Sequence, residues 1–159
     1  MSFEVEHIGP HTLYRGDCLE VMETLGKFDA VVTDPVWPNC PRGLIPGSEN
    51  PYELFAAWCA LSPPHKRMVV VMRHDSDPRF LAPIQRPYAR AVFLPYVMPG
   101  YIGRYLGGDE IAYCFGEPVK SAPGRRVIPG RAPAAPPSFR PPNGHPCSRT
   151  LLHPDFIIN

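Results

Sequence analysis

The segment from Phe28 to Asn39, FDAVVTDPVWPN, constrains the fold of this chain more than any other. Ala30 to Val32 is a short apolar, mostly β-branched run, which is typical of a strand buried on both faces of a parallel sheet. Pro35 ends this strand, because proline has no N–H for the ladder and fixes its own φ. We therefore expect Asp34 and Trp37 just beyond the carboxyl end of a parallel strand, where open α/β sheets bind ligands.

The residue types at this corner suit an aromatic ring that carries an amine. The Asp34 carboxylate and the Pro35 carbonyl are two acceptors for one exocyclic amine, and Trp37 offers a face for stacking. Such a set fits a flipped-out adenine or cytosine, which an enzyme must extrude from the duplex. A strand followed by a proline-rich turn, with Trp37 in the core, explains the same residues. The four-residue pattern alone does not decide between a base-binding site and this plain turn.

Three further segments accompany this motif in a fixed order: Gly16–Glu20 (GDCLE), Glu110–Gly116 (EIAYCFG) and Gly144–Arg149 (GHPCSR). Together with Asp34-Pro35-Val36-Trp37 they resemble the amino-DNA methyltransferases that use S-adenosylmethionine. The resemblance is to the permuted class, in which a DPPY or DPPW motif precedes the glycine-rich cofactor motif. It covers about residues 12 to 149.

The resemblance implies a Rossmann-like α/β methyltransferase sheet and methyl transfer from S-adenosylmethionine to adenine N6 or cytosine N4 in DNA. It implies a catalytic role for Asp34, Pro35 and Trp37. It also implies a cofactor-binding role for five residues: Asp17, Cys18, His145, Ser148 and Arg149. A plain capped helix is the alternative for Asp17 and Cys18, because any α/β unit can contain one.

The chain departs from the family pattern at two points. Val36 stands where the family has a second proline, and no FxGxG cofactor motif occurs in the sequence. We therefore expect an incomplete sheet that stops before that motif. A catalytically silent nucleic-acid-binding protein, or one half of a split methyltransferase, remains an alternative. The strand at 29–33 would then have an unpaired edge, which a second copy or a partner chain should cover.

Length and composition predict a single globular unit. The chain has 159 residues, of which 44% are hydrophobic and 19% charged, and its net charge of +1 gives no global argument for nucleic acid. Its five cysteines are odd in number and form no CxxC pair, which favours a reduced, cytoplasmic protein. Cys18, Cys59 and Cys114 lie in apolar patterns and are expected in the core. We find no signal peptide and no apolar run of about 20 residues, as a membrane span requires.

The chain divides into an α/β core, residues 1–117, and a Pro/Arg-rich arm, residues 118–159. No Asp or Glu occurs from Pro118 to Pro154. Such a basic, extended arm suits DNA phosphates, although a solvated linker explains it equally well. The expected DNA-binding residues come from a Gly-rich loop and this arm: Arg104, Arg125, Arg126, Arg131 and Arg140. No metal is expected, because His145, Cys147 and His153 fall short of a four-ligand zinc site.

The remaining patterns predict the other elements. Residues 3–15 favour a hairpin, and helices are expected at 18–25, capped by Asp17, and at 51–61, capped by Asn50 with Glu53 completing a capping box. Strands are expected at 29–33, 68–72, 90–95 and 111–115, in a mostly parallel sheet whose last strands pair antiparallel. Trp58 should lie in the core. The residues from Arg73 to Asp77 line the same cleft as Asp34 or, as the sequence favours, form a solvated loop.

Overall fold

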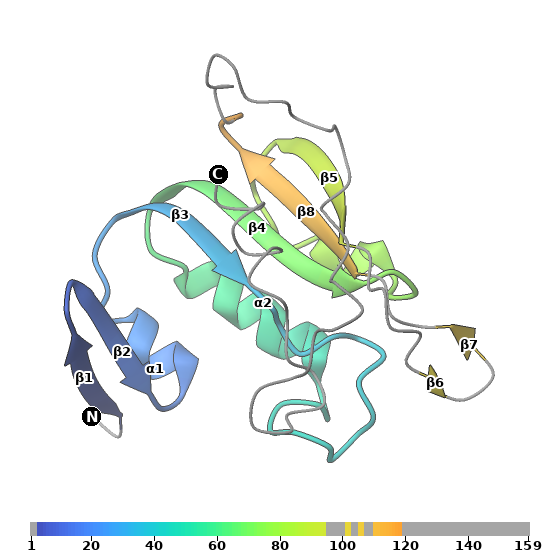
Figure 1. Ribbon diagram of the computed structural model, residues 1–159, viewed down its shortest axis with the longest axis horizontal. Helices are drawn as coiled ribbons and strands as arrows, with labels where there is room; N and C mark the ends of the chain where they lie inside the picture. The colour runs from blue at the N-terminus through green and yellow to red at the C-terminus, as the bar shows by residue number, and fades with distance from the viewer. Residues whose placement is uncertain (1–2, 95–100, 103–104, 107–109, 119–159) are drawn as a thin grey trace.

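A four-stranded mixed sheet forms the centre of the computed structural model, which describes residues 3–94, 101–102, 105–106 and 110–118 (Figure 1). The strands stand in the order β3 (Phe28–Thr33), β4 (His65–Arg73), β8 (Glu110–Gly116) and β5 (Tyr88–Leu94). β3 pairs parallel with β4, and β8 pairs antiparallel with both β4 and β5. Thus β3, β4 and β5 run in one direction and β8 runs in the other.

All four predicted strands are confirmed, and so is the antiparallel pairing of the last ones. Three of the four strands run in the same direction, as a mostly parallel sheet requires, but most neighbouring strands pair antiparallel. Within the described ranges, β3 and β4 form the one parallel pair of neighbours in this sheet.

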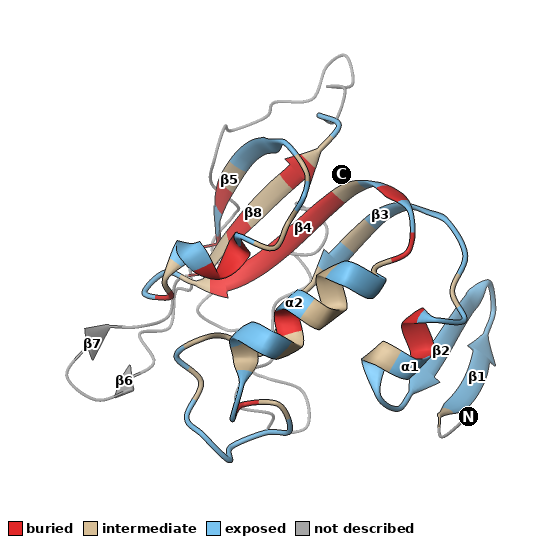
Figure 2. Ribbon diagram, turned by 180° about the vertical axis from the view of Figure 1, so that it is seen from behind, coloured by how far each residue is buried: buried red, intermediate tan, exposed pale blue. Residues whose placement is uncertain are grey.

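The two faces of β4 carry two separate apolar clusters, because side chains alternate along a strand. Met68, Val70 and Met72 belong to the cluster that also contains Phe55 of helix α2 (Pro51–Leu61). Val69 and Val71 belong to a second cluster with residues of β5 and β8. β4 is accordingly the most buried strand in Figure 2, as its continuous apolar run predicted.

Helix α2 lies across one face of the sheet (Figure 2). Phe55 stacks on Phe80 of the 3-10 helix η1 (Pro78–Leu81), with ring centroids 4.4 Å apart. Trp58 is half-buried and packs against the same core, in agreement with the sequence prediction. The predicted helix bounds are confirmed, but the Asn50 side chain makes no capping hydrogen bond, so the predicted capping box is wrong.

The amino-terminal part is a hairpin followed by a short helix, as predicted. β1 (Glu4–Ile8) and β2 (His11–Arg15) pair antiparallel across a turn in which Gly9 has a φ of 58°, a conformation that favours glycine. Helix α1 (Cys18–Met22) ends three residues earlier than expected. In both views the hairpin and α1 lie on the β3 side of the sheet. Strands β6 (Tyr101–Ile102) and β7 (Tyr105–Leu106) form a separate antiparallel pair.

Two burial expectations are wrong. β3 is not covered on both faces: it stands at the edge of the sheet, and Val32 is 48% exposed. An edge strand has a neighbour on one side alone, so its apolar residues lose part of the cover that an inner strand receives. Cys18 is exposed rather than in the core, because it lies in the first turn of α1, whose buried residues are Val21 and Met22. Cys59 and Cys114 are half-buried.

Candidate functional site

The site predicted from the sequence lies at the carboxyl end of β3, on the parallel side of the sheet. Thr33 is the last residue of β3 to pair with β4, opposite Val70. Asp34 follows with an exposed side chain, and Pro35 is half-buried. Proline cannot continue the ladder, so the chain leaves the sheet directly after Asp34. The structure therefore places a carboxylate and a backbone carbonyl beyond the strand end, as the sequence predicted.

Trp37 is tied to the neighbouring strand. Its indole Nε1–H donates a hydrogen bond of 3.1 Å to the Val71 carbonyl of β4, one residue beyond the last β3–β4 pair. The half-buried ring also packs against the cluster that contains Met72 and Phe80. A buried indole N–H needs such an acceptor, and this bond fixes where the ring lies. Trp37 thus has a clear structural role, whether or not it also stacks on a base.

Asn39 joins the loop after β3 to the loop after β4. Its Nδ2 donates to Asp75 Oδ1 at 3.0 Å, and its Oδ1 accepts a 2.8 Å hydrogen bond from Ser76 Oγ. Asp75 also forms an ion pair with Arg73, with 2.8 Å between nitrogen and oxygen. Ser76 is buried, whereas His74 and Asp75 are exposed, so the loop is solvated in part, as the sequence favoured, and packed in part. The two strand ends are held side by side by side-chain contacts.

The rest of the second loop is shaped by Asp77. Its carboxylate accepts from the Arg79 backbone N–H at 2.9 Å, which caps η1, and it forms an ion pair with the Arg79 side chain. These hydrogen bonds, from the Arg79 side chain first and its backbone second, lower the pKa of Asp77. The Asp77 carboxylate therefore makes local contacts with Arg79 and stabilises the start of η1.

A hollow of about 280 Å³ lies between the loop that follows Trp37 and the start of α2. Ser48 organises part of its wall: its Oγ accepts from Gly43 N at 2.9 Å and donates to Ile45 O at 2.7 Å. Tyr52 contributes a half-exposed ring. The lining combines residues of the loop and of the helix start: Pro38, Cys40, Arg42, Ser48, Glu49, Asn50, Pro51, Tyr52 and Glu53.

Asp17 and Cys18 lie at the start of α1, as the sequence predicted. Asp17 Oδ1 accepts from Leu19 N at 2.8 Å, which makes Asp17 the N-cap of the helix. Partial burial, and then the nearby Asp17 carboxylate, raise the pKa of the Cys18 thiol. Cys18 therefore stays protonated at neutral pH. The capped-helix interpretation thus accounts for the hydrogen bond of the Asp17 side chain.

The other predicted site residues lie outside the described part of the chain. They are the cofactor candidates His145, Ser148 and Arg149 and the DNA-binding candidates Arg104, Arg125, Arg126, Arg131 and Arg140. Their roles stay predictions.

Sequence reasoning named the segment from Arg73 to Asp77 but missed the contacts that connect the two strand ends. The contacts of Trp37 with Val71 and of Asn39 with Ser76 span 34 and 37 residues of chain, and no local pattern announces them. Among the described residues, no group of three or more His, Cys, Asp or Glu side chains is placed to hold a metal ion. No helix in the described ranges has the length and apolar character to cross a membrane.

Comparison with known proteins gives one informative match. No protein-family model and no curated protein matches the sequence. Among solved structures, the crystal structure of the M1.HpyAVI-SAM complex matches with a TM-score of 0.55 at 21% sequence identity. The match covers 91% of this chain and 74% of that one. At this identity the likeness speaks for the fold alone: the chain has an α/β, Rossmann-like fold similar to that of the matched structure.

Proposed function

We propose that this protein is a DNA methyltransferase that transfers a methyl group from S-adenosylmethionine to the exocyclic amine of adenine (N6) or cytosine (N4). The observation that carries the proposal is the position of Asp34 and Pro35. They follow directly on a parallel strand, in a fold similar to that of a protein crystallised with SAM. Ligands of open α/β sheets bind at this edge.

In the proposed reaction, the chain's own groups position the amine. The Asp34 carboxylate and the Pro35 carbonyl accept hydrogen bonds from the two amine hydrogens, which directs the nitrogen lone pair toward the methyl group. No covalent bond to the enzyme is needed. The rate enhancement then comes from orientation and from fixed acceptors, which cost no reorganisation during the reaction.

The segment that follows these acceptors is held against β4 and the loop after it. Trp37 bonds to Val71 of β4, and Asn39 bonds to Asp75 and Ser76 of the next loop. A reaction that depends on positioning requires rigid support of this kind. In this proposal Trp37 also stacks on the target base with the part of its ring that the protein leaves exposed.

The cofactor would supply a methyl group that its sulfonium activates. At the start of α1, Asp17 fits a cofactor-binding role in part, because one carboxylate oxygen caps the helix and the exposed side chain keeps a second acceptor. Cys18 is exposed beside it. We propose that these two residues, with His145, Ser148 and Arg149, hold the cofactor.

Most of the DNA contacts in this proposal come from basic residues that have no acidic neighbours in sequence. From Pro118 to Pro154 the chain contains Arg and Lys but no Asp or Glu. Arginines spaced along an extended arm suit the phosphate backbone. We assign this role to Arg125, Arg126, Arg131 and Arg140, together with Arg104.

A second candidate is a catalytically silent nucleic-acid-binding protein or one half of a split methyltransferase. Two observations favour it. Asp17 is engaged as a helix cap, and Trp37 is engaged with β4, so both residues have structural roles without any substrate.

A methylation assay with labelled S-adenosylmethionine and duplex DNA tests the proposal. Asp34→Ala should lower methyl transfer by about a hundredfold or more, because one fixed acceptor is lost. Asp29→Ala is the matched control: Asp29 is an exposed carboxylate on the same strand whose contact is an ion pair with Lys66 at 3.4 Å. This control should retain activity.

Calorimetry of S-adenosylmethionine binding to the same chains separates the two candidates. Micromolar binding by wild type and by Asp34→Ala, with activity lost in the variant alone, supports the enzyme. Equal activity of wild type and Asp34→Ala refutes the assigned mechanism. DNA binding without cofactor binding, even at millimolar cofactor, favours the second candidate.

A further inference from the structure

The loop between β3 and α2 exposes apolar side chains that the proposed reaction does not use. Leu44 is 65% exposed and Ile45 is 45% exposed, and the Pro46 that follows them is exposed too. The loop begins at the Asp34 corner and extends past the carboxyl end of β3 (Figure 1, Figure 2). Residues 44–46 therefore form an apolar tip on the loop that starts at the proposed site.

Contacts inside the loop hold the apolar tip in place. Ser48 is buried, and its Oγ accepts from Gly43 N at 2.9 Å and donates to Ile45 O at 2.7 Å. The Ser48 N–H donates to the same carbonyl at 3.1 Å. Gly43 and Gly47 have φ angles of 75° and 88°, which glycine adopts without strain, so the chain turns on both sides of the tip. The loop conformation therefore keeps the tip in solvent.

The loop is also attached to the rest of the protein on both sides of the tip. Before the tip, Asn39 bonds to Asp75 and Ser76 of the loop after β4. After the tip, a Cβ at Gly47 would press on the Leu54 side chain of α2, so the loop backbone and the helix lie in contact. The tip thus projects from a support that is connected to the sheet and to α2.

The charges of this loop do not favour phosphate as the partner of the tip. Arg42 and Glu49 are the charged residues between positions 35 and 49, and their charges cancel. The tip itself is aliphatic and offers no side-chain hydrogen-bond donor. The face of a nucleobase is uncharged, and aliphatic side chains pack well against it. Leu, Ile and Pro are among the residues that proteins insert as wedges between base steps.

We propose that Leu44 and Ile45 form a wedge that enters the DNA duplex and fills the gap left by the extruded target base. Extrusion costs the stacking energy of that base, and apolar contacts with its former neighbours offset part of this cost. The inference rests on the proposed function, because it takes DNA as the substrate and base extrusion as a step. It assigns the opening of the duplex to a loop that makes no contact with the methyl group.

Fluorescence anisotropy with three labelled DNAs of equal length tests the wedge in the full chain. They are an intact duplex, the same duplex with one abasic site, and the single strand. The abasic duplex already contains a gap, so the wedge enters it without unstacking a base. The chain should bind this duplex about tenfold tighter than the intact one, a factor on the order of that expected for burying one Leu side chain.

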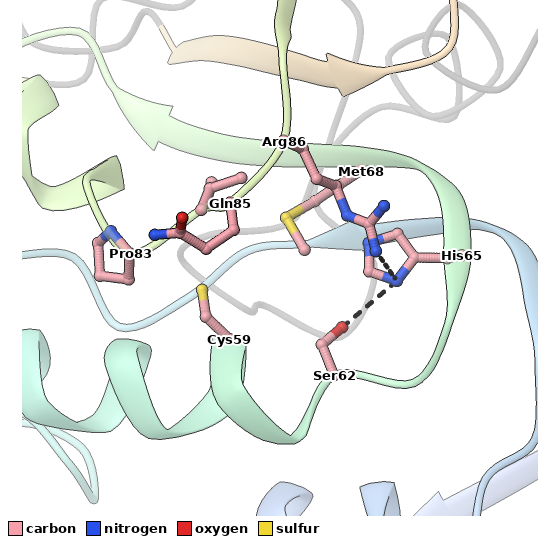
Figure 3. A pocket seen from close by; sticks show the side chains of 8 residues that line it. Cys59, Ser62, His65, Met68, Pro83, Gln85 and Arg86 are labelled. Atoms are coloured by element: carbon pink, nitrogen blue, oxygen red, sulfur yellow. Dashed lines mark hydrogen bonds between the residues drawn. The ribbon is translucent and has the colours of Figure 1, made fainter.

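Variants at exposed positions assign the effect to the tip. The double variant Leu44→Ser with Ile45→Ser should lose the preference for the abasic duplex, whereas Leu44→Met should keep it, because methionine also fills a gap with apolar atoms. Leu61→Ser is the matched control and should keep the preference. Leu61 is 40% exposed and stands between Cys59 and Ser62, which line a hollow at the amino end of β4 (Figure 3). All variants should bind the single strand as wild type does.

Methyl transfer measured on the same chains separates failure of the wedge from failure of the proposed reaction. A preference for the abasic duplex without methyl transfer supports the wedge and contradicts the reaction. Methyl transfer without that preference overturns the wedge and leaves the reaction standing. The wedge is also overturned if the chain binds none of the three DNAs, if Leu61→Ser loses the preference too, or if the double variant keeps it. A changed oligomeric state of a double variant that keeps the preference would assign the tip to a contact between protein chains.

Discussion

Asn39 illustrates how one side chain can organise two loops. Its amide donates to Asp75 and accepts from Ser76, so both ends of the group are used. The loop after β3 carries Asp34, and the loop after β4 carries Asp75. Because the two strands are parallel neighbours, the Asn39 contacts fix the spacing of the loops at their carboxyl ends. The same contacts hold the loop that begins with Asp34 next to the loop that follows β4.

At this scale we expect Asn39→Ala to lower the free energy of unfolding by about 1 to 2 kcal/mol, because two hydrogen bonds are lost and the buried Ser76 hydroxyl loses its acceptor. Urea unfolding measures the change. Asn50→Ala is the matched control, because the Asn50 side chain makes no capping bond, and it should change stability far less. Equal losses in the two variants would show that the Asn39 contacts add no stability.

Single residues were predictable where their partners are close in sequence. Asp17 was expected to cap α1, and it bonds to Leu19, two residues away. Trp37 was expected either to stack on a base or to lie in the core, and its partner Val71 is 34 residues away. Nothing local in the sequence specifies such a contact, because it exists only once β3 and β4 have paired.

At the scale of elements, the end of β8 is set by a glycine. Gly116 has a φ of 89°, its N–H donates to the Pro87 carbonyl at 2.8 Å, and it pairs with Arg67. A Cβ at this position would collide with the Lys66 carbonyl oxygen. Both the backbone conformation and the close approach of β4 therefore require glycine. This turn holds β8 in register between its two neighbours.

Gly116→Ala should accordingly destabilise the fold by about 2 to 4 kcal/mol, from the positive φ and from the displaced backbone of β4. Gly26→Ala serves for comparison, because a Cβ there meets nothing within 4 Å and the residue has no positive φ. Thermal unfolding of both variants checks the difference. If Gly116→Ala melted at the wild-type temperature, the register described for β8 would be wrong.

The strands themselves were largely predictable, but the burial of β3 was not. β3 and β4 both contain apolar β-branched runs, and both were expected to be covered on two faces. β4 is covered because it lies between β3 and β8 and contacts α2. β3 has β4 on one side alone among the described strands, so Val32 stays exposed. Strand order in the sheet decides this difference, and a local pattern does not contain that order.

At the scale of the whole molecule, the β3 side exposes several large apolar side chains among the described residues. Val32 is exposed on the edge strand, and the hairpin that lies on this side exposes Val5, Ile8 and Leu13. An open edge with apolar side chains is a surface on which another chain can add. This arrangement agrees with the expectation of a second copy or a partner chain, which stays a prediction.

Light scattering over a range of concentrations tests that expectation, and we expect dimers at high concentration. Val32→Lys should shift the chain toward monomer, because a lysine on an edge strand opposes pairing. Phe93→Lys places the same charge at an exposed position on β5, the strand at the opposite side of the described sheet, and should leave the dimer intact. A clean monomer at every concentration, or loss of the dimer in Phe93→Lys alone, would contradict the prediction.

The place of β8 in the sheet has a consequence for the order of events during synthesis. β8 is the last of the four strands to leave the ribosome, yet it lies between β4 and β5. β3 and β4 can pair as soon as both have emerged, whereas β5 has no neighbour in this sheet until residues 110–116 follow it. The nascent chain therefore carries β5 as an unattached apolar strand for some time. A chaperone that binds such strands would act in this interval, before β8 has left the ribosome.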